Sequence, residues 1–84
     1  MFSVFIDHPK RFEKQMRVLP EFMQRKVAAV IEQLAQFPKV QQIKKLSNGG
    51  YRIRVGDYRV LFDVDEGKGL ILVYGVGHRR DIYR

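Results

Sequence analysis

Hydrophobic residues recur with a helical period through the first half of the chain. Phe12, Met16 and Leu19 follow one another at i, i+4 and i+7, so they share one face of a helix. A second apolar face comprises Met23, Val27, Val30, Ile31, Leu34 and Phe37. Pro20 separates the two faces, and Pro38 follows the second. The pattern predicts an antiparallel pair of helices, each of which needs a partner surface for its apolar side.

A short hydrophobic run precedes the helices. Residues 2–6 read Phe-Ser-Val-Phe-Ile, which is typical of a β-strand. Asp7 is a suitable N-cap for the first helix, and Pro9 fits a first helical turn. We therefore expect a strand and then, at once, the start of a helix.

The second half of the chain has the period of two that is typical of strands. In residues 51–55 two arginines, Arg52 and Arg54, alternate with hydrophobic side chains, and Arg59 does the same in residues 58–64. Gly-Asp separates these two runs, and Glu-Gly-Lys-Gly follows the second, so both junctions are predicted to be turns. The pattern predicts a β-meander.

Two further segments complete the fold prediction. Residues 70–76 are apolar on both faces, which indicates a central strand covered on each side. Residues 40–46 are polar and are interpreted as a connector that ends in a turn at 47–50. The fold class is therefore α+β: a short N-terminal strand, an α-helical hairpin and an antiparallel β-meander, with one twisted sheet and the helices on one face. No internal repeat or linker is visible, so residues 1–84 are expected to form a single domain.

Composition excludes several kinds of site. The chain has no cysteine, which excludes disulfides, cysteine nucleophiles and thiolate zinc sites. Its two histidines, His8 and His78, lie far apart in sequence, so we expect no metal and no cofactor. No apolar run reaches the roughly 20 residues that span a bilayer, and residues 1–7 do not resemble a signal peptide. We expect a cytoplasmic protein that does not contact membranes.

The charge of the chain points to a polyanionic partner. Sixteen Lys and Arg against nine Asp and Glu give a net charge of +7, although small proteins also carry such an excess for solubility. If the helices cover one sheet face, then Arg52, Arg54 and Arg59 project from the other, within about 5–8 Å of one another. Guanidinium groups so placed suit bidentate phosphate binding. The alternative is ordinary surface pairing with carboxylates of the same chain: Asp57, Asp63 or Asp65.

The end of the chain adds further candidates. Arg79, Arg80 and Tyr83 follow the last predicted strand, and an aromatic ring among arginines suits base stacking beside phosphate contacts. Taken alone, a basic tail of this kind is more often simply solvated. His78, at the end of the strand, is either a participant in chemistry or an ordinary surface residue.

These motifs together resemble the RelE family of toxins, within the RelE/ParE superfamily of toxin–antitoxin systems. They are Lys-Leu at 45–46, Tyr-Arg-Ile-Arg-Val at 51–55, Gly-Asp-Tyr-Arg-Val at 56–60 and Val-Gly-His-Arg-Arg-Asp-Ile-Tyr-Arg at 76–84. The resemblance implies a ribosome-dependent mRNA endoribonuclease that cuts in the A site, inhibits translation and is held inactive by an antitoxin. The implied partners are a RelB-like antitoxin, mRNA and the ribosome with its 16S rRNA, with operator DNA bound only through the antitoxin.

The resemblance also implies the site. The catalytic candidates are Arg59, Arg79, Tyr83, Arg54 and His78. The RNA-binding candidates are Arg52, Arg54, Lys45 and Arg80. Some RelE-type toxins carry lysine where this chain has Arg52 and Arg54, and an arginine is a poor general base because it stays protonated. Proton abstraction is therefore left to Tyr83, to His78 or to RNA positioned by the ribosome.

Two other functions remain open for the same fold. A ParE-like toxin inhibits DNA gyrase by protein contact and cuts nothing. A degenerate relative would bind only antitoxin or RNA. The arginines together with Tyr83 favour the nuclease, because ParE-like chains generally lack that set.

Overall fold

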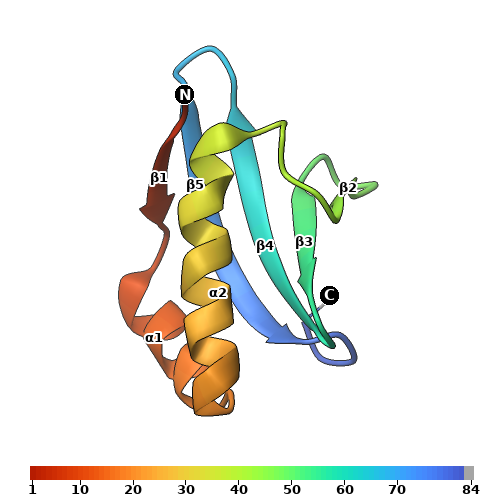
Figure 1. Cartoon of the computed structure of the whole chain (residues 1–84). Coiled ribbons are helices and arrows are strands. Elements are labelled where there is room, and N and C mark those ends of the chain that lie inside the picture. The colour runs from red at the N-terminus through yellow and green to blue at the C-terminus, as the bar shows by residue number, and fades with distance from the viewer. Residues whose placement is uncertain (83–84) are drawn as a thin grey trace.

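A twisted five-stranded sheet carries two helices in the computed structural model, which describes residues 1–82 of the 84-residue chain (Figure 1). The elements in chain order are β1 Ser3–Ile6, α1 Pro9–Arg17, α2 Glu21–Gln33, the 3₁₀ turn η1 Leu34–Gln36, β2 Ile43–Lys45, β3 Tyr51–Val55, β4 Tyr58–Asp65 and β5 Leu70–His78. The strands lie in the order β1-β5-β4-β3-β2; β1 is parallel to β5, and the other neighbours are antiparallel. The predicted α+β fold class is confirmed.

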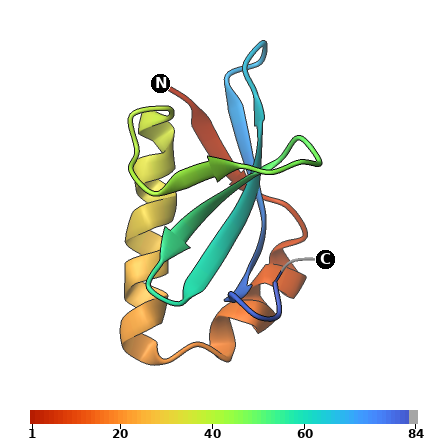
Figure 2. The same ribbon diagram turned by 90° about the vertical axis from the view of Figure 1, so that its right-hand side faces the viewer.

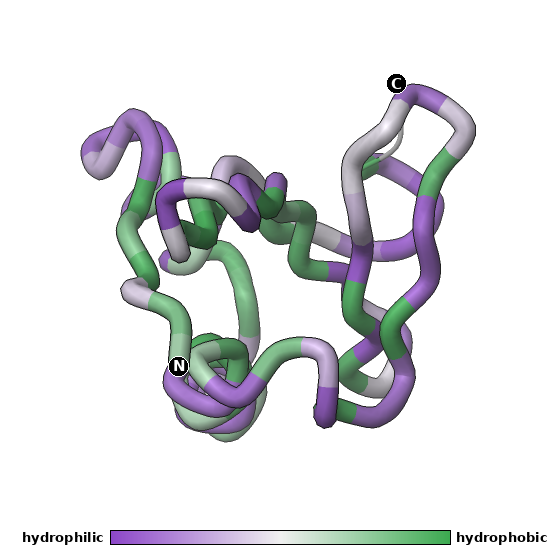
Figure 3. The backbone as a smooth tube through the Cα atoms, turned by 90° about the horizontal axis from the view of Figure 1, so that it is seen from above, coloured by the Kyte–Doolittle hydropathy of each residue, from purple (hydrophilic) through white to green (hydrophobic). Residues whose placement is uncertain are grey.

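The core lies between α2 and the sheet, which form two layers in side view (Figure 2). Val27 and Leu34 of the helical layer and Val60 and Phe62 of β4 are completely buried. Burial of each such side chain contributes about 1.5–3 kcal/mol. Seen from above, the tube coloured by hydropathy shows hydrophobic and hydrophilic stretches interspersed along the chain (Figure 3). Residues of both predicted helical faces contribute to this core, as their spacing indicated.

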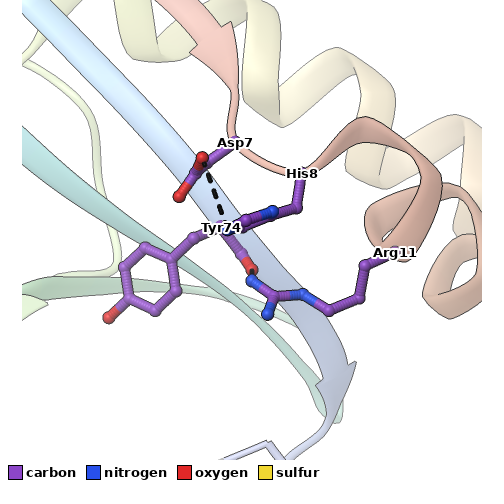
Figure 4. Close-up of polar contacts among 4 residues, drawn as sticks. All are labelled: Asp7, His8, Arg11 and Tyr74. Carbon is purple, nitrogen blue, oxygen red and sulfur yellow. Dashed lines mark hydrogen bonds and ion pairs between the residues drawn. The ribbon is translucent and has the colours of Figure 1, made fainter.

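Helix α1 adds Phe12 to the core and also runs beside the edge of β5. β1 pairs with β5 only as far as Val73, which leaves the rest of that edge without a strand. There the Gln15 side-chain oxygen accepts a hydrogen bond from the Val76 N–H at 3.0 Å. Arg11 Nη2 donates to the Tyr74 carbonyl at 3.2 Å (Figure 4). Side chains of α1 therefore satisfy backbone groups that a neighbouring strand would otherwise satisfy.

The start of α1 differs from the prediction by one residue. His8, not Asp7, is the N-cap; it has φ 54° and makes no capping hydrogen bond through its side chain. The Asp7 N–H donates to the Val73 carbonyl at 2.7 Å, so this residue still belongs to the pairing with β5. The Asp7 carboxylate instead faces the His8 ring, with 3.8 Å between Oδ1 and Nε2 (Figure 4). Asp7 thus takes part in sheet pairing and does not cap the helix.

Two strand predictions also need correction. The segment 40–46 is not only a connector, because Ile43–Lys45 pairs with β3 as the edge strand β2. Ile43 is half-buried, whereas Lys44 and Lys45 are exposed. The strand is therefore too short to show the alternation of apolar and polar residues that would identify it in the sequence. β5 is not covered on both sides along its length either, because Leu72 is 38% exposed beside Phe5, which is 52% exposed.

A β-bulge changes which face the second half of β5 presents. Leu61 is paired with Gly75, but the next residue of β4, Phe62, is paired with Val73, so β5 has one extra residue at Tyr74. The extra residue reverses the alternation. As a result, Val76 lies in the core, and the glycines at 75 and 77 fall on the other face.

Candidate functional site

Arginines of β3 and β4 share the sheet face opposite α2, which we call the open face. Arg54 and Arg59 are directly opposite each other in the antiparallel register, and Arg52 is opposite Leu61. Residues paired in this way point to the same side, with Cβ atoms about 4.5–5.5 Å apart. Ile53, between Arg52 and Arg54, and Val60, next to Arg59, are buried in the core beneath α2. All three arginines therefore lie on the open face, as the alternation predicted.

Arg59 is the most enclosed of these arginines, with 9% of its surface exposed. Its Nη1 donates to the carbonyls of Tyr58 at 3.2 Å and Gly56 at 3.4 Å, which are long and therefore weak hydrogen bonds. Its buried Nε has no hydrogen-bond partner among residues 1–82. A buried donor without an acceptor costs about 1–3 kcal/mol, and more in a charged group, so the burial of Arg59 lowers the stability of the fold.

Carboxylates of the described residues do not neutralise the open face. The ion pairs within residues 1–82 are Asp7–His8, Glu13–Arg17 and Glu21–Arg25. Arg54 is exposed, and Arg52 Nη1 donates to the Gln42 carbonyl at 3.3 Å. Within this part of the chain, the alternative of surface pairing with Asp57, Asp63 or Asp65 therefore has no contact to support it.

The register of β2 separates two neighbouring lysines. Lys45 is opposite Tyr51 and its Nζ lies 5.9 Å from that ring, so it is on the α2 side of the sheet and not with the arginines. Lys44 is opposite Arg52, which places it at the margin of the open face. The sequence prediction missed Lys44 because it treated this segment as a connector. A strand assignment there would have identified it.

The chain end folds back at the same end of the sheet as Arg59. The Arg79 N–H donates to the Asp57 carbonyl at 2.9 Å, which extends the pairing of β5 with the β3–β4 turn. Arg79 and Arg80 are both exposed. Tyr83, the predicted aromatic participant, lies outside the described residues. The structure thus brings Arg79 close to Arg54 and Arg59 in the fold, while the position of the tyrosine is not described.

His78 contributes to the shape of this chain end. Its Nδ1 accepts a hydrogen bond from the Arg80 N–H at 3.2 Å, and its ring lies edge-on to Tyr58, 5.4 Å between centroids. A neutral imidazole has a single acceptor nitrogen, so in this conformation that nitrogen is already occupied. The contact assigns His78 a structural task at the turn.

Two hollows flank the folded-back chain end. One, of about 350 Å³, is lined by residues that include Gln15 of α1, Tyr58, His78 and Ile82. The other, of about 340 Å³, is lined by residues that include Leu61, Tyr74 and Ile82. Residues 1–82 contain no cluster of three or more histidine and acidic side chains suited to hold a metal ion. Over the same residues, no helix has the length and hydrophobicity needed to cross a membrane.

A family model described as the ParE toxin of type II toxin–antitoxin system, parDE, matches residues 8–83. The chain belongs to this family, and it is a type II toxin of the RelE/ParE fold. No curated protein sequence matches it significantly.

Solved structures of RelE toxins share the fold. The toxin–antitoxin complex RelBE2 from Mycobacterium tuberculosis matches with a TM-score of 0.77 at 22% identity, covering 93% of this chain and 98% of that one. The RelE–RelB complex from Pyrococcus horikoshii matches with 0.76 at 24%, covering 95% and 97%. The isolated Escherichia coli RelE toxin matches with 0.70 at 20%, covering 93% and 84%. At these identities the likeness shows the fold.

Proposed function

We propose that this toxin is a ribosome-dependent mRNA endoribonuclease that cuts in the A site and thereby inhibits translation in the cytoplasm. The observation that supports the proposal is the open face, where arginines of two adjacent strands lie opposite each other with no carboxylate partner among the described residues. An RNA phosphate would supply oxygens to such guanidinium groups.

The proposed reaction is a transfer within the RNA. The 2′-oxygen forms a bond to the adjacent phosphorus as the bond from phosphorus to the 5′-oxygen breaks. A base takes the proton of the 2′-hydroxyl and the departing 5′-oxygen gains one, leaving a 2′,3′-cyclic phosphate and a 5′-hydroxyl. Arg59 and Arg79 stabilise the charge that develops on the phosphoryl oxygens, and Arg52 and Arg54 hold neighbouring phosphates.

The identity of the base follows partly from His78. Its Nδ1 accepts from the Arg80 N–H, which leaves a neutral ring no free acceptor for the 2′-hydroxyl proton. This favours Tyr83 as the base, or alignment of the 2′-hydroxyl by the ribosome without a strong base. Exposed Arg80 and Lys44, which lies opposite Arg52, would contact RNA at the margins of the site, whereas Lys45 lies on the α2 side of the sheet.

A RelB-like antitoxin is the proposed partner of the free toxin. The family description names a toxin–antitoxin system, and the similar M. tuberculosis and P. horikoshii toxins were solved as complexes. Several large apolar side chains are exposed: Phe5, Val18, Phe22 and Leu72. With a net charge of +7, this surface suits an acidic, partly disordered segment that folds as it binds. Contact with operator DNA would be made by that antitoxin.

Gyrase inhibition without cleavage is the second candidate. The matched family model is that of ParE toxins, and the Arg59 guanidinium is hydrogen-bonded to backbone carbonyls instead of projecting freely. In this alternative the open face would contact a protein, and no bond would break.

Translation of a reporter mRNA in a purified system, with 5′ ends mapped by primer extension, separates the candidates. We expect codon-phased cuts that appear only with ribosomes, and loss of those cuts in Arg79→Ala. The matched control is Arg25→Ala, which removes an exposed arginine paired with Glu21 on α2 and should cut normally. Inhibition of DNA supercoiling by gyrase, without cuts in the mRNA, would support the second candidate. Normal cleavage by Arg79→Ala would refute the site assignment.

A further inference from the structure

Two glycines interrupt the open face of β5 beside the arginines. Gly75 is opposite Leu61, and Gly77 is opposite Arg59. A Cβ atom added at Gly77 would lie 3.2 Å from Cδ1 of Ile82, and one added at Gly75 would lie 3.5 Å from the same atom. The missing side chains leave a slot that Ile82 occupies, which we call the glycine slot.

A tight backbone turn brings Ile82 back to the strand that precedes it. The His78 carbonyl accepts hydrogen bonds from the Asp81 N–H at 2.9 Å and the Ile82 N–H at 3.1 Å. The Arg80 N–H donates to Nδ1 of the same histidine at 3.2 Å. The chain therefore reverses within residues 78–82 and returns over the open face of β5.

Arg79 lies inside this turn and is held on both sides of it. On one side its N–H is bonded to the Asp57 carbonyl. On the other side the chain continues to Ile82 in the glycine slot. Hydrogen bonds at an exposed chain end open easily when no apolar contact supports them. The Ile82 side chain supplies that contact, next to the position of Arg59 across the sheet.

We propose that Ile82 is a positioning residue for the cleavage reaction: its side chain, lying in the glycine slot, holds the turn 78–82 so that Arg79 stays beside Arg59. This inference rests on the proposed function. Ile82 acts through Arg79, and the hydrocarbon side chain itself has no chemistry to offer a phosphate. Displacement of a catalytic group by about 1 Å costs up to about 100-fold in rate, so a loosened turn is sufficient to impair cleavage.

Three variants test the proposal by removing the same contact from either side. Ile82→Ala empties the slot, Gly77→Ala fills it, and the double variant does both. We expect each single variant to lower the cleavage rate at saturating toxin at least about tenfold, with the half-saturating concentration changed less than about twofold. The double variant should be no slower than the slower single variant, because both changes remove one shared contact. Ile82→Leu should recover most of the rate.

Leu70→Ala is the matched control. Leu70 is a half-buried aliphatic residue on the open face at the other end of the same strand, opposite Asp65. Its truncation should leave the cleavage rate unchanged. A loss of rate in the control as large as that in Ile82→Ala would show that any apolar truncation on β5 impairs the protein, and the proposal would be overturned.

Amide hydrogen exchange provides a readout that does not depend on activity. The Asp81 and Ile82 amides should exchange faster in Ile82→Ala and Gly77→Ala than in the natural chain. If the natural chain cleaves nothing, the proposed function fails and this role fails with it, while exchange still reports whether Ile82 holds the turn. If the natural chain cleaves and Ile82→Ala cleaves equally fast, or loses only affinity, the positioning role is refuted and the proposed function stands.

Discussion

The open face of the sheet has two ends with opposite character. The arginine end, next to the β3–β4 turn, carries Arg54 and Arg59. The aspartate end, next to the β4–β5 turn, carries Asp63 and Asp65. Both ends rest on one hydrophobic core, and β4 runs from one to the other, carrying Arg59 at the first and Asp63 and Asp65 at the second. One end of the open face is therefore basic and the other acidic, within a chain whose net charge is +7.

The two ends also differ in how they are covered. At the arginine end the chain turns back and Ile82 lies in the glycine slot, while Arg59 is almost completely buried. At the aspartate end Phe5 and Leu72 lie side by side and stay exposed. The chain itself therefore covers the arginine end, whereas the aspartate end leaves apolar side chains exposed.

The largest expected effect comes from Arg59→Met. Cleavage should fall by about 10³-fold or more, because a cation that stabilises the developing charge is lost. The free energy of unfolding should not fall, because replacing a buried, incompletely bonded charge with an apolar side chain is often neutral or stabilising. Primer extension measures the first quantity, and urea denaturation the second.

Asp63→Asn is the matching change at the aspartate end and should leave cleavage within about twofold of the natural chain, as expected of a surface substitution remote from the arginines. A loss of stability together with cleavage in Arg59→Met would mean that the arginine supports the fold. In that case the contrast between the ends would not be functional.

The salt dependence of RNA binding should also distinguish the arginine end from the aspartate end. Arg54→Gln should lower the slope of log K against log salt by about 0.7, because one contact to a single-stranded phosphate is lost. Lys68→Gln, at the β4–β5 turn, removes the same charge from the aspartate end and should leave the slope unchanged. Fluorescence anisotropy with labelled single-stranded RNA measures both. Equal slopes for the two variants would indicate attraction by net charge alone.

The turns at the two ends of β4 should respond differently to alanine. Gly56 has φ 60°, and its added Cβ would lie 3.3 Å from Met23 Cε, so Gly56→Ala should lower the free energy of unfolding by about 1 kcal/mol. At Gly67 the added Cβ meets only Asp65 Oδ1, at 3.6 Å, and Gly67→Ala should change stability by less than about 0.5 kcal/mol. Urea denaturation measures both, and equal losses would contradict the strain argument.

The smallest expected effect is that of Leu72→Thr. Its stability should stay within about 0.5 kcal/mol of the natural chain, because the side chain is already substantially exposed. Cleavage by the free toxin should not change. The antitoxin should bind less tightly, which a titration of the pair measures. Unchanged antitoxin affinity would show that the partner covers another surface.

Local patterns were sufficient for much of this fold. Alternation in residues 51–55 and 58–64 placed the arginines on one face, because strand geometry depends only on neighbouring residues. Proline at position 20 and the glycine at 56 similarly located the junctions of the helices and of the hairpin. In contrast, β2 has three residues, and only its pairing with β3 identifies it as a strand.

The amino-acid sequence alone determined that the chain forms an α+β fold and that three of its arginines share a sheet face, because periodicity is a property of the backbone. Only the tertiary structure decided which of them is buried and where the chain end lies. The position of the chain end depends on the bulge at Tyr74, which turns Gly75 and Gly77 toward the open face, where Ile82 lies against them. Such a shift of register depends on how neighbouring strands pair and pack, and therefore on residues distant in sequence.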